Sequence, residues 1–310
     1  MSDIELPKEP MAPIRESKIP TGAEWGFQLK WDGVRLLAEL QQNRIRLFSR
    51  YMGDKTNIYP EAVKLLTEHA LRHQPLLLDG EAVIFDTVKQ RPDFSQILQR
   101  ERTRSATARI KGRETSHFIY VLFDLLHYGG EDWRDRPYHE RHAKLLELFP
   151  DKHPQLFVTD LISDGDALWD WVDANGWEGI ISKRLSSPYR EGKHHKDWFK
   201  KKTAEVHEVD FIGFIIREGR VASLIMVKNG ALFGRVSLGL DTSMKTRLLT
   251  FGREQERAEA PLNRTQLPYE LRREQILWLS KPLKGTVTGL EVTSAGQLRH
   301  PKLVHIEWEE

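Results

Sequence analysis

The hydrophobic pattern of the chain changes near residue 205, and this change limits the folds that the chain can adopt. Before that point, apolar runs of strand length alternate with stretches that repeat apolar residues at helical intervals. After it, short strand-like segments such as residues 210–220 and 222–230 follow one another with glycine-bearing turns. We therefore predict an α+β multidomain fold with one domain over residues 1–204 and a second over residues 205–310.

The first domain is expected to combine strands and helices. Residues 26–50 indicate a start rich in hairpins, and the apolar runs at 76–85 and 118–127 are typical of central strands. Helices are predicted over residues 59–73, near 94–98, and over 138–149 and 166–175. The second domain, with short strands, glycine-bearing turns and one helix, is typical of a small β-barrel of the oligonucleotide-binding kind.

The composition excludes several kinds of chemistry. The chain has no cysteine, so disulfides, thiolate metal sites and cysteine nucleophiles are ruled out. Its first residues are acidic and no run approaches 18 apolar residues, so we expect a cytoplasmic protein without a membrane span. The net charge is only +2, but basic residues are concentrated in residues 100–113 and 193–202, which favours a polyanion as partner.

The tetrapeptide Lys30-Trp31-Asp32-Gly33, with Arg35 two residues later, lies where one predicted strand gives way to the next. A lysine at a strand end can present its amine to a phosphate, and the glycine lets the backbone approach a ligand closely. On its own, this pattern is also that of an ordinary β-turn. Its meaning therefore depends on the rest of the sequence.

Further motifs follow in a fixed order. They are Ser49-Arg50, Asp79-Gly80-Glu81, Phe123-Asp124-Leu125-Leu126, Glu178-Gly179-Ile180 and Trp198-Phe199-Lys200-Lys201-Lys202. With the lysine motif, this set resembles the covalent nucleotidyltransferases and, within them, the ATP-dependent DNA ligases. The segments GAEWGFQLKWDGVR, RPDFSQILQR and GQLRHPKLV are similar to the ligase domain of ligase D, a bacterial end-joining enzyme.

The resemblance implies both a fold and an activity. A nucleotidyltransferase (adenylation) domain would be followed by an oligonucleotide-binding β-barrel. The chain would be an ATP-dependent DNA ligase that seals 5′-phosphate/3′-hydroxyl breaks through a lysyl-AMP intermediate on Lys30, in DNA repair or end joining. Its partners would be nicked or broken duplex DNA and a Ku-like end-binding protein, and we expect a monomer.

The resemblance also assigns the ligand contacts. Phe123 would stack on adenine, Gln28 would meet the adenine edge, Glu81 would hold the ribose hydroxyls and Arg50 a phosphate. Glu178, with Glu81, would bind Mg²⁺ or Mn²⁺. Positive charge near the α-phosphate would come from Arg35, Lys200 and Lys202. Strand alternation places Lys200 and Lys202 on one face and Lys201 on the other.

Two departures from the family pattern stand out. Family members often carry glutamate where this chain has Gln28. The family's C-terminal motif continues into an Arg-x-Asp-Lys stretch, whereas this chain reads LVHIEWEE, which leaves Arg299 and Lys302 as the nearby basic candidates. Slow self-adenylylation is the expected result. Two alternatives stay open: an RNA ligase or capping-type nucleotidyltransferase, and a non-catalytic DNA-end-binding module.

Overall fold

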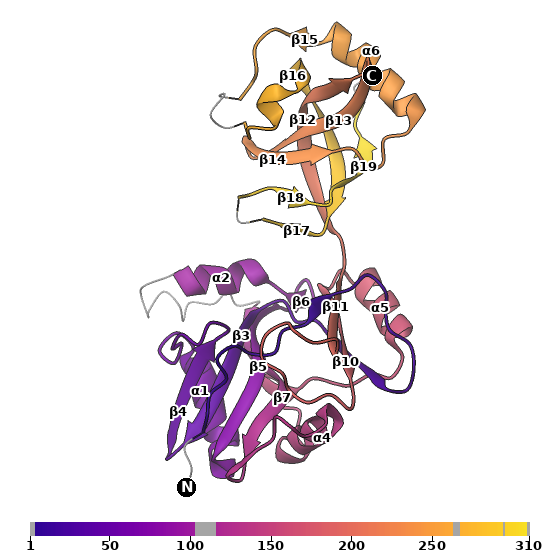
Figure 1. Ribbon diagram of the computed structural model, residues 1–310. Coiled ribbons are helices and arrows are strands. Elements are labelled where there is room, and N and C mark those ends of the chain that lie inside the picture. Colours follow the sequence, from indigo (N-terminus) through magenta and orange to yellow (C-terminus); the bar gives the residue numbers. More distant parts are fainter. Residues whose placement is uncertain (1–3, 103–115, 263–266, 294, 309–310) are drawn as a thin grey trace. The chain divides into compact units, whose positions relative to one another are not determined.

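The computed structural model describes residues 4–102, 116–262, 267–293 and 295–308. The chain divides into two compact units, Met1–Thr203 and Ala204–Glu310, each with its own hydrophobic core (Figure 1). Most of the basic stretch at 100–113 lies outside the described residues. Within those residues, no helix is long and apolar enough to cross a membrane.

The larger sheet of the first unit has seven strands. Its main path is β4 (Arg44–Ser49), β3 (Val34–Gln41), β5 (Leu76–Asp86), β7 (Ser116–Tyr128) and β8 (Glu131–Asp132). The short strands β6 (Arg91–Pro92) and β9 (Leu156–Val158) pair with β5 and β7. The prediction that the runs at 76–85 and 118–127 form central strands is confirmed.

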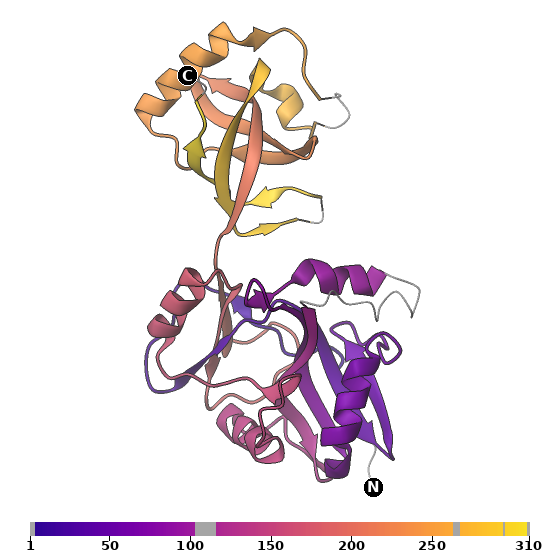
Figure 2. The ribbon, with the colours of Figure 1, turned by 180° about the vertical axis from the view of Figure 1, so that it is seen from behind.

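A helix covers one face of this sheet. The predicted helix over residues 59–73 is shorter in the structure, because α1 (Pro60–His69) ends at Ala70 and a 3₁₀ turn, Leu71–His73, follows. Figure 2 shows α1 lying across the sheet when the unit is seen from behind. Leu36, Ala38 and Leu40 alternate along β3 and pack into the same core as Leu65 and Leu66 of α1.

The second sheet of this unit has four strands in the order β1 (Ile14–Arg15), β11 (Trp198–Lys202), β10 (Gly179–Arg184) and β2 (Trp25–Leu29). The expected series of hairpins over residues 26–50 is therefore wrong in part. β3 and β4 form a hairpin, but β2 pairs with β10 instead of β3. The lysine motif thus joins strands of two different sheets, a long-range pairing that local patterning does not reveal.

Within its described residues, the first unit has three further α-helices: α2 (Phe94–Arg102), α4 (Tyr138–Leu148) and α5 (Gly165–Ala174). Helix α5 begins after Asp164, whose carboxylate accepts a hydrogen bond from the backbone N–H of Ala167, an ordinary N-cap. Val172 of α5 packs in one core with Trp25, Phe27 and Ile180 of the four-stranded sheet. This packing leaves the opposite face of that sheet for the large sheet and for a ligand.

The second unit is built on a six-stranded antiparallel sheet. Its path is β14 (Ala231–Val236), β13 (Arg220–Lys228), β12 (Glu205–Arg217), β16 (Gln275–Gly289) and β15 (Glu256–Arg257), with β19 (Lys302–Ile306) beside β16. Two short strands, β17 (Glu291–Val292) and β18 (Leu298–Arg299), form a separate pair. Helix α6 (Thr242–Glu254) is capped by Asp241 and places Leu248 in the core.

Candidate active site

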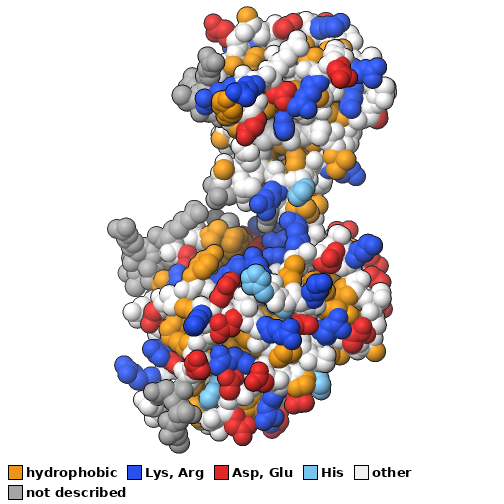
Figure 3. Space-filling view, viewed as in Figure 1, with side chains coloured by type: hydrophobic (Ala, Val, Ile, Leu, Met, Phe, Trp, Pro, Cys, Tyr) orange, Lys and Arg blue, Asp and Glu red, His pale blue; other side chains and the backbone are white. Residues whose placement is uncertain are grey.

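A pocket of about 420 Å³ lies between the two sheets of the first unit. Its lining includes most of the residues that the sequence singles out: Gln28, Lys30, Arg35, Arg50, Glu81, Phe123 and Lys200. Glu178 and Lys202 are not part of the lining. Glu178 forms ion pairs with both Lys30 and Lys202, so both residues lie next to the pocket. Figure 3 shows Lys and Arg side chains gathered on part of the surface of this unit.

Strand register builds one wall of the pocket. Gln28 of β2 lies opposite Ile181 of β10, and Ile181 lies opposite Lys200 of β11. Side chains two residues apart along a strand share a face. Lys30 therefore belongs to the same face as Gln28, and Lys202 belongs to the same face as Lys200. Lys201 belongs to the other face, where its Nζ lies 3.8 Å from the ring centroid of Trp169.

Lys30 follows directly after β2 and is held by residues next to β10. Its backbone N–H donates to the carbonyl of Gly179 over 2.9 Å, and its Nζ donates to Glu178 Oε2 over 2.5 Å. Lys202 Nζ lies 2.7 Å from Glu178 Oε1. Gly179 has φ 150°, and a Cβ there would lie 2.1 Å from the carbonyl oxygen of Lys201. Only glycine therefore allows Glu178 to reach both lysines.

Gly33 explains the turn after the lysine. A Cβ at this position would lie 2.2 Å from the carbonyl oxygen of Ala82 on β5. The chain therefore passes from one sheet to the other in close contact with β5, which places Lys30 beside Glu81.

The opposite wall comes from the large sheet. Arg35 of β3 and Glu81 of β5 are direct cross-strand partners, and Phe123 of β7 completes this side of the pocket. The Arg35 guanidinium lies over the Phe123 ring, 5.3 Å from its centroid.

Arg35 lines the pocket and forms a buried ion pair with Asp79. Its Nε and Nη2 donate to the two carboxylate oxygens of Asp79 over 2.8 and 2.5 Å, and its Nη1 donates to the Met11 carbonyl over 2.6 Å. Burial lowers the pKa of Arg35, but the charges of Asp79, Tyr189 and Glu81, together with the hydrogen bonds to Asp79, raise it above its ordinary value. In this arrangement the guanidinium ties β3 to β5 and to the N-terminal segment, and each of its three nitrogens donates to a protein group.

Two groups in the pocket have unusual proton affinities. Burial raises the pKa of Glu81 to about 8, although the nearby charges of Lys30 and Arg35 favour its ionised form. Burial lowers the pKa of Lys200 to about 8, and the charges of Lys30 and Lys202 act in the same direction. Both groups therefore change charge close to neutral pH, which is common in sites that bind or transfer charged groups.

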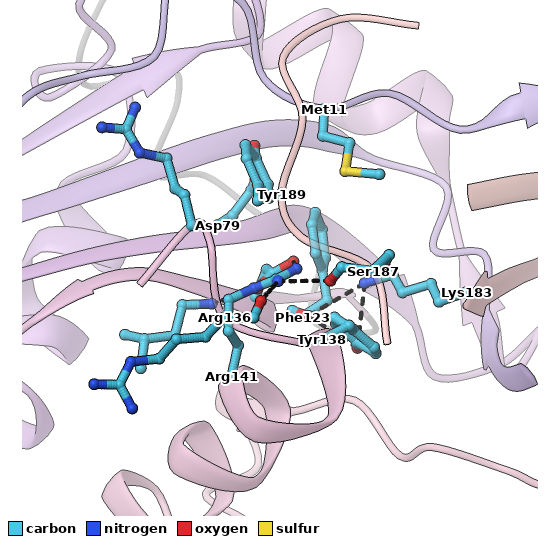
Figure 4. Close-up of polar contacts among 12 residues, drawn as sticks. Met11, Asp79, Phe123, Arg136, Tyr138, Arg141, Lys183, Ser187 and Tyr189 are labelled. Carbon is cyan, nitrogen blue, oxygen red and sulfur yellow. Dashed lines mark hydrogen bonds and ion pairs between the residues drawn. The ribbon is translucent and has the colours of Figure 1, made fainter. Parts of the chain in front are cut away.

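Lys183 is a pocket residue that the sequence analysis does not select. Only 2% of it is exposed, and its Nζ donates to the Phe123 carbonyl and to the Tyr138 hydroxyl, each over 3.2 Å (Figure 4). Its Nζ also lies 4.0 Å from the ring centroid of Trp198. Burial lowers the pKa of Lys183 to about 7. The available signal was alternation along β10, which puts Lys183 on the same face as Ile181.

A second buried ion pair supports this part of the pocket. Arg141 Nε lies 2.7 Å from Asp124 Oδ1, and neither side chain is exposed. Arg141 also donates to the carbonyls of Arg136 and Ser187. The pair thereby fixes the strand that carries Phe123 to α4 and to the loop that follows β10.

The N-terminal segment forms one edge of the pocket. Ala12 donates its backbone N–H to the Gly192 carbonyl over 2.8 Å, and its own carbonyl lies 3.1 Å from His195 Nε2. Pro13, next in the chain, also lines the pocket. His195 therefore has a structural role here, and among the described residues no group of three His, Cys, Asp or Glu is arranged to hold a metal.

Arg50 and Tyr51 lie at the mouth of the pocket. They belong to a tight turn in which the Met52 backbone N–H donates to the Ser49 carbonyl and the Gly53 N–H donates to Ser49 Oγ. Tyr51 is exposed, and Arg50 contributes to the pocket lining. Arg299 and Lys302 belong to β18 and β19 of the second unit.

The carboxylates fit a weakly held divalent cation. Glu178 and Glu81 are acidic side chains that interact with Lys30. Mg²⁺ usually keeps several waters and binds through one or two carboxylates together with phosphate oxygens of a substrate. Two carboxylates in a pocket rich in lysine are therefore a suitable set only if a nucleotide supplies the remaining oxygens.

Comparison with known proteins identifies related sequences. The family described as ATP dependent DNA ligase domain matches residues 12–202. The chain is 36% identical over 202 residues to the multifunctional non-homologous end joining protein LigD of Pseudomonas aeruginosa, which covers 64% of this chain and 22% of that protein. It is 32% identical over 291 residues to the LigD protein of Mycobacterium bovis, covering 89% of this chain and 35% of the relative.

Solved structures resemble the chain over almost its whole length. The ligase domain of M. tuberculosis LigD is 31% identical, with a TM-score of 0.54 over 96% of this chain and 95% of that domain. A mycobacterial DNA ligase D complexed with ATP and MES is 30% identical, with a TM-score of 0.55 over 97% of this chain and 96% of that one. The predicted nucleotidyltransferase fold followed by an oligonucleotide-binding-like β domain is confirmed.

Proposed function

The chain belongs to the ATP-dependent DNA ligase family, and we propose that it seals 5′-phosphate/3′-hydroxyl breaks in duplex DNA through AMP bound covalently to Lys30. The observation that carries this proposal is the position of Lys30 in the pocket, with Glu178 2.5 Å from its Nζ and Lys200 and Arg50 in the same lining. The first unit would be the adenylation domain and the second would bind the DNA backbone.

The reaction would have three displacements at phosphorus. First, the unprotonated Nζ of Lys30 attacks the α-phosphorus of ATP, a P–N bond forms, and the P–O bond to pyrophosphate breaks. Next, an oxygen of the DNA 5′-phosphate attacks the same phosphorus, which breaks the P–N bond and caps the DNA end with AMP. Finally, the 3′-hydroxyl attacks the 5′-phosphate and AMP leaves.

The basic residues suit the phosphate end of the nucleotide. Lys200 and Arg50 carry donors and positive charge close to Lys30, which would stabilise the negative charge that develops on the α-phosphate. Lys202 lies outside the pocket lining and its Nζ is paired with Glu178, so its charge would act on the phosphate from a greater distance. Arg35 would support the wall instead of contacting phosphate, since its donors are held by Asp79 and Met11.

The nucleoside would lie on the other side of Lys30. Phe123 offers a ring for stacking on adenine. Gln28 on β2 lies two residues before Lys30 and would meet the edge of the base. Glu81 lies beside Lys30 and would bind the ribose hydroxyls. A protonated Glu81 can still donate one hydrogen bond and accept another, so its raised pKa is compatible with that contact.

Glu178 and Glu81 would hold Mg²⁺ or Mn²⁺ together with the nucleotide. When bound, such a cation neutralises phosphate charge and polarises the bonds at phosphorus. In the structure, Glu178 forms ion pairs with Lys30 and Lys202.

The names of the relatives support a proposal for the cellular role. Several are end-joining proteins by name, and the chain spans only 22% and 35% of the first two curated relatives. We propose a role in DNA repair by end joining, with broken or nicked duplex DNA as substrate and a Ku-like protein as partner.

Two measurements test the proposal. Incubation with ATP labelled at the α-phosphate and Mg²⁺ is expected to give an acid-labile protein–AMP adduct, which peptide mass spectrometry places on Lys30. Nicked DNA should then be sealed with ATP. Sealing of RNA alone, or adduct formation with GTP alone, would favour an RNA ligase or capping enzyme. No adduct at all would indicate a non-catalytic DNA-end-binding module.

A further inference from the structure

The pocket has two chemically different ends, and strand spacing separates them. Gln28 lies two residues before Lys30 on the same face, about 7 Å away along the strand. Next to Gln28 on this wall, β10 contributes Ile181 and Lys183, and β11 contributes Trp198. If phosphate lies at Lys30, as the proposed function requires, the base lies among Gln28, Lys183, Trp198 and Phe123.

Two buried donors at this base end have no partner. Gln28 is 2% exposed and Trp198 is 1% exposed, and both line the pocket. By distance and angle, Gln28 Nε2 and Trp198 Nε1 form no hydrogen bond with any residue that the structure describes. Burial raises the pKa of Tyr138, although the Gln28 amide lies close enough to the Tyr138 hydroxyl to act against that rise. Because a buried donor without an acceptor is unfavourable, a ligand that brings acceptor atoms to this end would bind better than one that does not.

The other charged groups nearby do not add a free acceptor. Lys183 is a further donor, already bonded to the Phe123 carbonyl and the Tyr138 hydroxyl. The carboxylates of Asp79 and Asp124 each accept two hydrogen bonds from an arginine. The side chains at the base end are therefore mainly donors, and Gln28 Oε1 is the amide acceptor among them.

We propose that this pocket accepts 6-oxopurine nucleoside triphosphates as well as ATP, and that the Gln28 amide sets this selectivity. Facing adenine, the amide donates to a ring nitrogen and accepts from the 6-amino group. Turned over, it donates from Nε2 to the O6 oxygen of hypoxanthine or guanine and accepts from their N1–H. A carboxylate at the same position only accepts, so it would suit the 6-amino group and oppose O6. This inference rests on the proposed function of the site.

The test compares ATP and ITP as donors of the covalent nucleotide, each labelled at the α-phosphate, with the wild-type protein and Gln28→Glu. The wild type is expected to form the ITP adduct at a rate within about 100-fold of that with ATP. In Gln28→Glu the ratio of the ATP rate to the ITP rate should rise at least about tenfold, because the amide donor is lost. Asp170→Asn, at an exposed position on α5 outside the pocket lining, should leave this ratio unchanged.

The result that overturns the inference is equally defined. A wild-type preference for ATP beyond about 100-fold, or a ratio that Gln28→Glu does not change, is incompatible with base reading by the amide. Calorimetric binding of ATP and ITP to Lys30→Ala, and to Lys30→Ala combined with Gln28→Glu, gives the same ratio without any chemistry. If the wild type forms no adduct with either nucleotide, the proposed ligase function fails, while the binding ratio still decides the question of base selectivity.

Discussion

Lys30 Nζ lies 2.5 Å from Glu178 Oε2, and the other oxygen of that carboxylate lies 2.7 Å from Lys202 Nζ. One carboxylate thus joins the lysine after β2 to a lysine at the end of β11. The pair orients the Lys30 side chain, but an amine that attacks phosphorus must be free to approach it as a nucleophile. If Lys30 is the nucleophile, as we propose, Glu178 has to exchange it for another positive partner when the nucleotide binds.

Glu178→Gln tests that exchange. The amide keeps the shape of the side chain but removes its charge, so we expect adduct formation with ATP to slow by about tenfold or more and to need a higher concentration of Mg²⁺ or Mn²⁺. The measurement is the initial adduct rate over a range of metal concentrations. The control is Asp170→Asn at an exposed position on α5. If the metal dependence does not move, Glu178 only positions Lys30.

Lys200 and Lys201 form a matched pair, because neighbouring residues on β11 face opposite ways. Lys200→Ala removes positive charge from the pocket and is expected to slow adduct formation by about 100-fold, as for loss of one transition-state donor. Lys201→Ala removes only the contact with Trp169 and should stay within about twofold of the wild type. Equal losses in both variants would show that the alternation does not determine which lysines act.

Much of this site follows from local sequence pattern. Alternation along β11 separates Lys200 from Lys201, and the apolar runs at 76–85 and 118–127 identify the strands that carry Glu81 and Phe123. Both inferences need only the two-residue period of a strand. The pocket itself follows from the resemblance, which places these strands around one nucleotide.

Other features depend on partners far along the chain. The motif of Arg35 does not reveal that its guanidinium binds Asp79, which is 44 residues away. Local sequence does not distinguish Lys183 from other lysines on strands. Its place in the pocket lining depends on the register that sets it opposite Trp198. Pairing of β2 with β10 spans about half of the chain, and such register is set by packing of whole sheets instead of by local sequence.

Arg35→Met should destabilise the first unit more than it affects nucleotide chemistry directly. The change leaves the fully buried Asp79 carboxylate without its arginine, which costs about 3–5 kcal/mol in comparable buried pairs. Urea unfolding followed by tryptophan fluorescence measures the loss. The double variant Arg35→Met/Asp79→Leu removes both charges and should recover part of it. A stable Arg35→Met with greatly weakened ATP binding would instead favour a direct phosphate contact.

Lys183→Met should change how stability depends on pH. Because burial lowers the pKa of Lys183 to about 7, the unfolded chain binds more protons at this residue than the folded chain between pH 7 and its ordinary value of 10.5. The wild type therefore gains stability as pH rises through this window, by up to about 1.4 kcal/mol per pH unit, and bears the full cost below pH 7. Methionine lacks this titration, so the stability of Lys183→Met relative to the wild type should be highest below pH 7 and fall towards pH 10.

Urea unfolding of both proteins at several pH values gives this difference, in which the other titrating groups largely cancel. Lys196→Met, at an exposed lysine, is the control and should give a flat difference; a flat difference for Lys183→Met as well would mean that the buried amine stays charged.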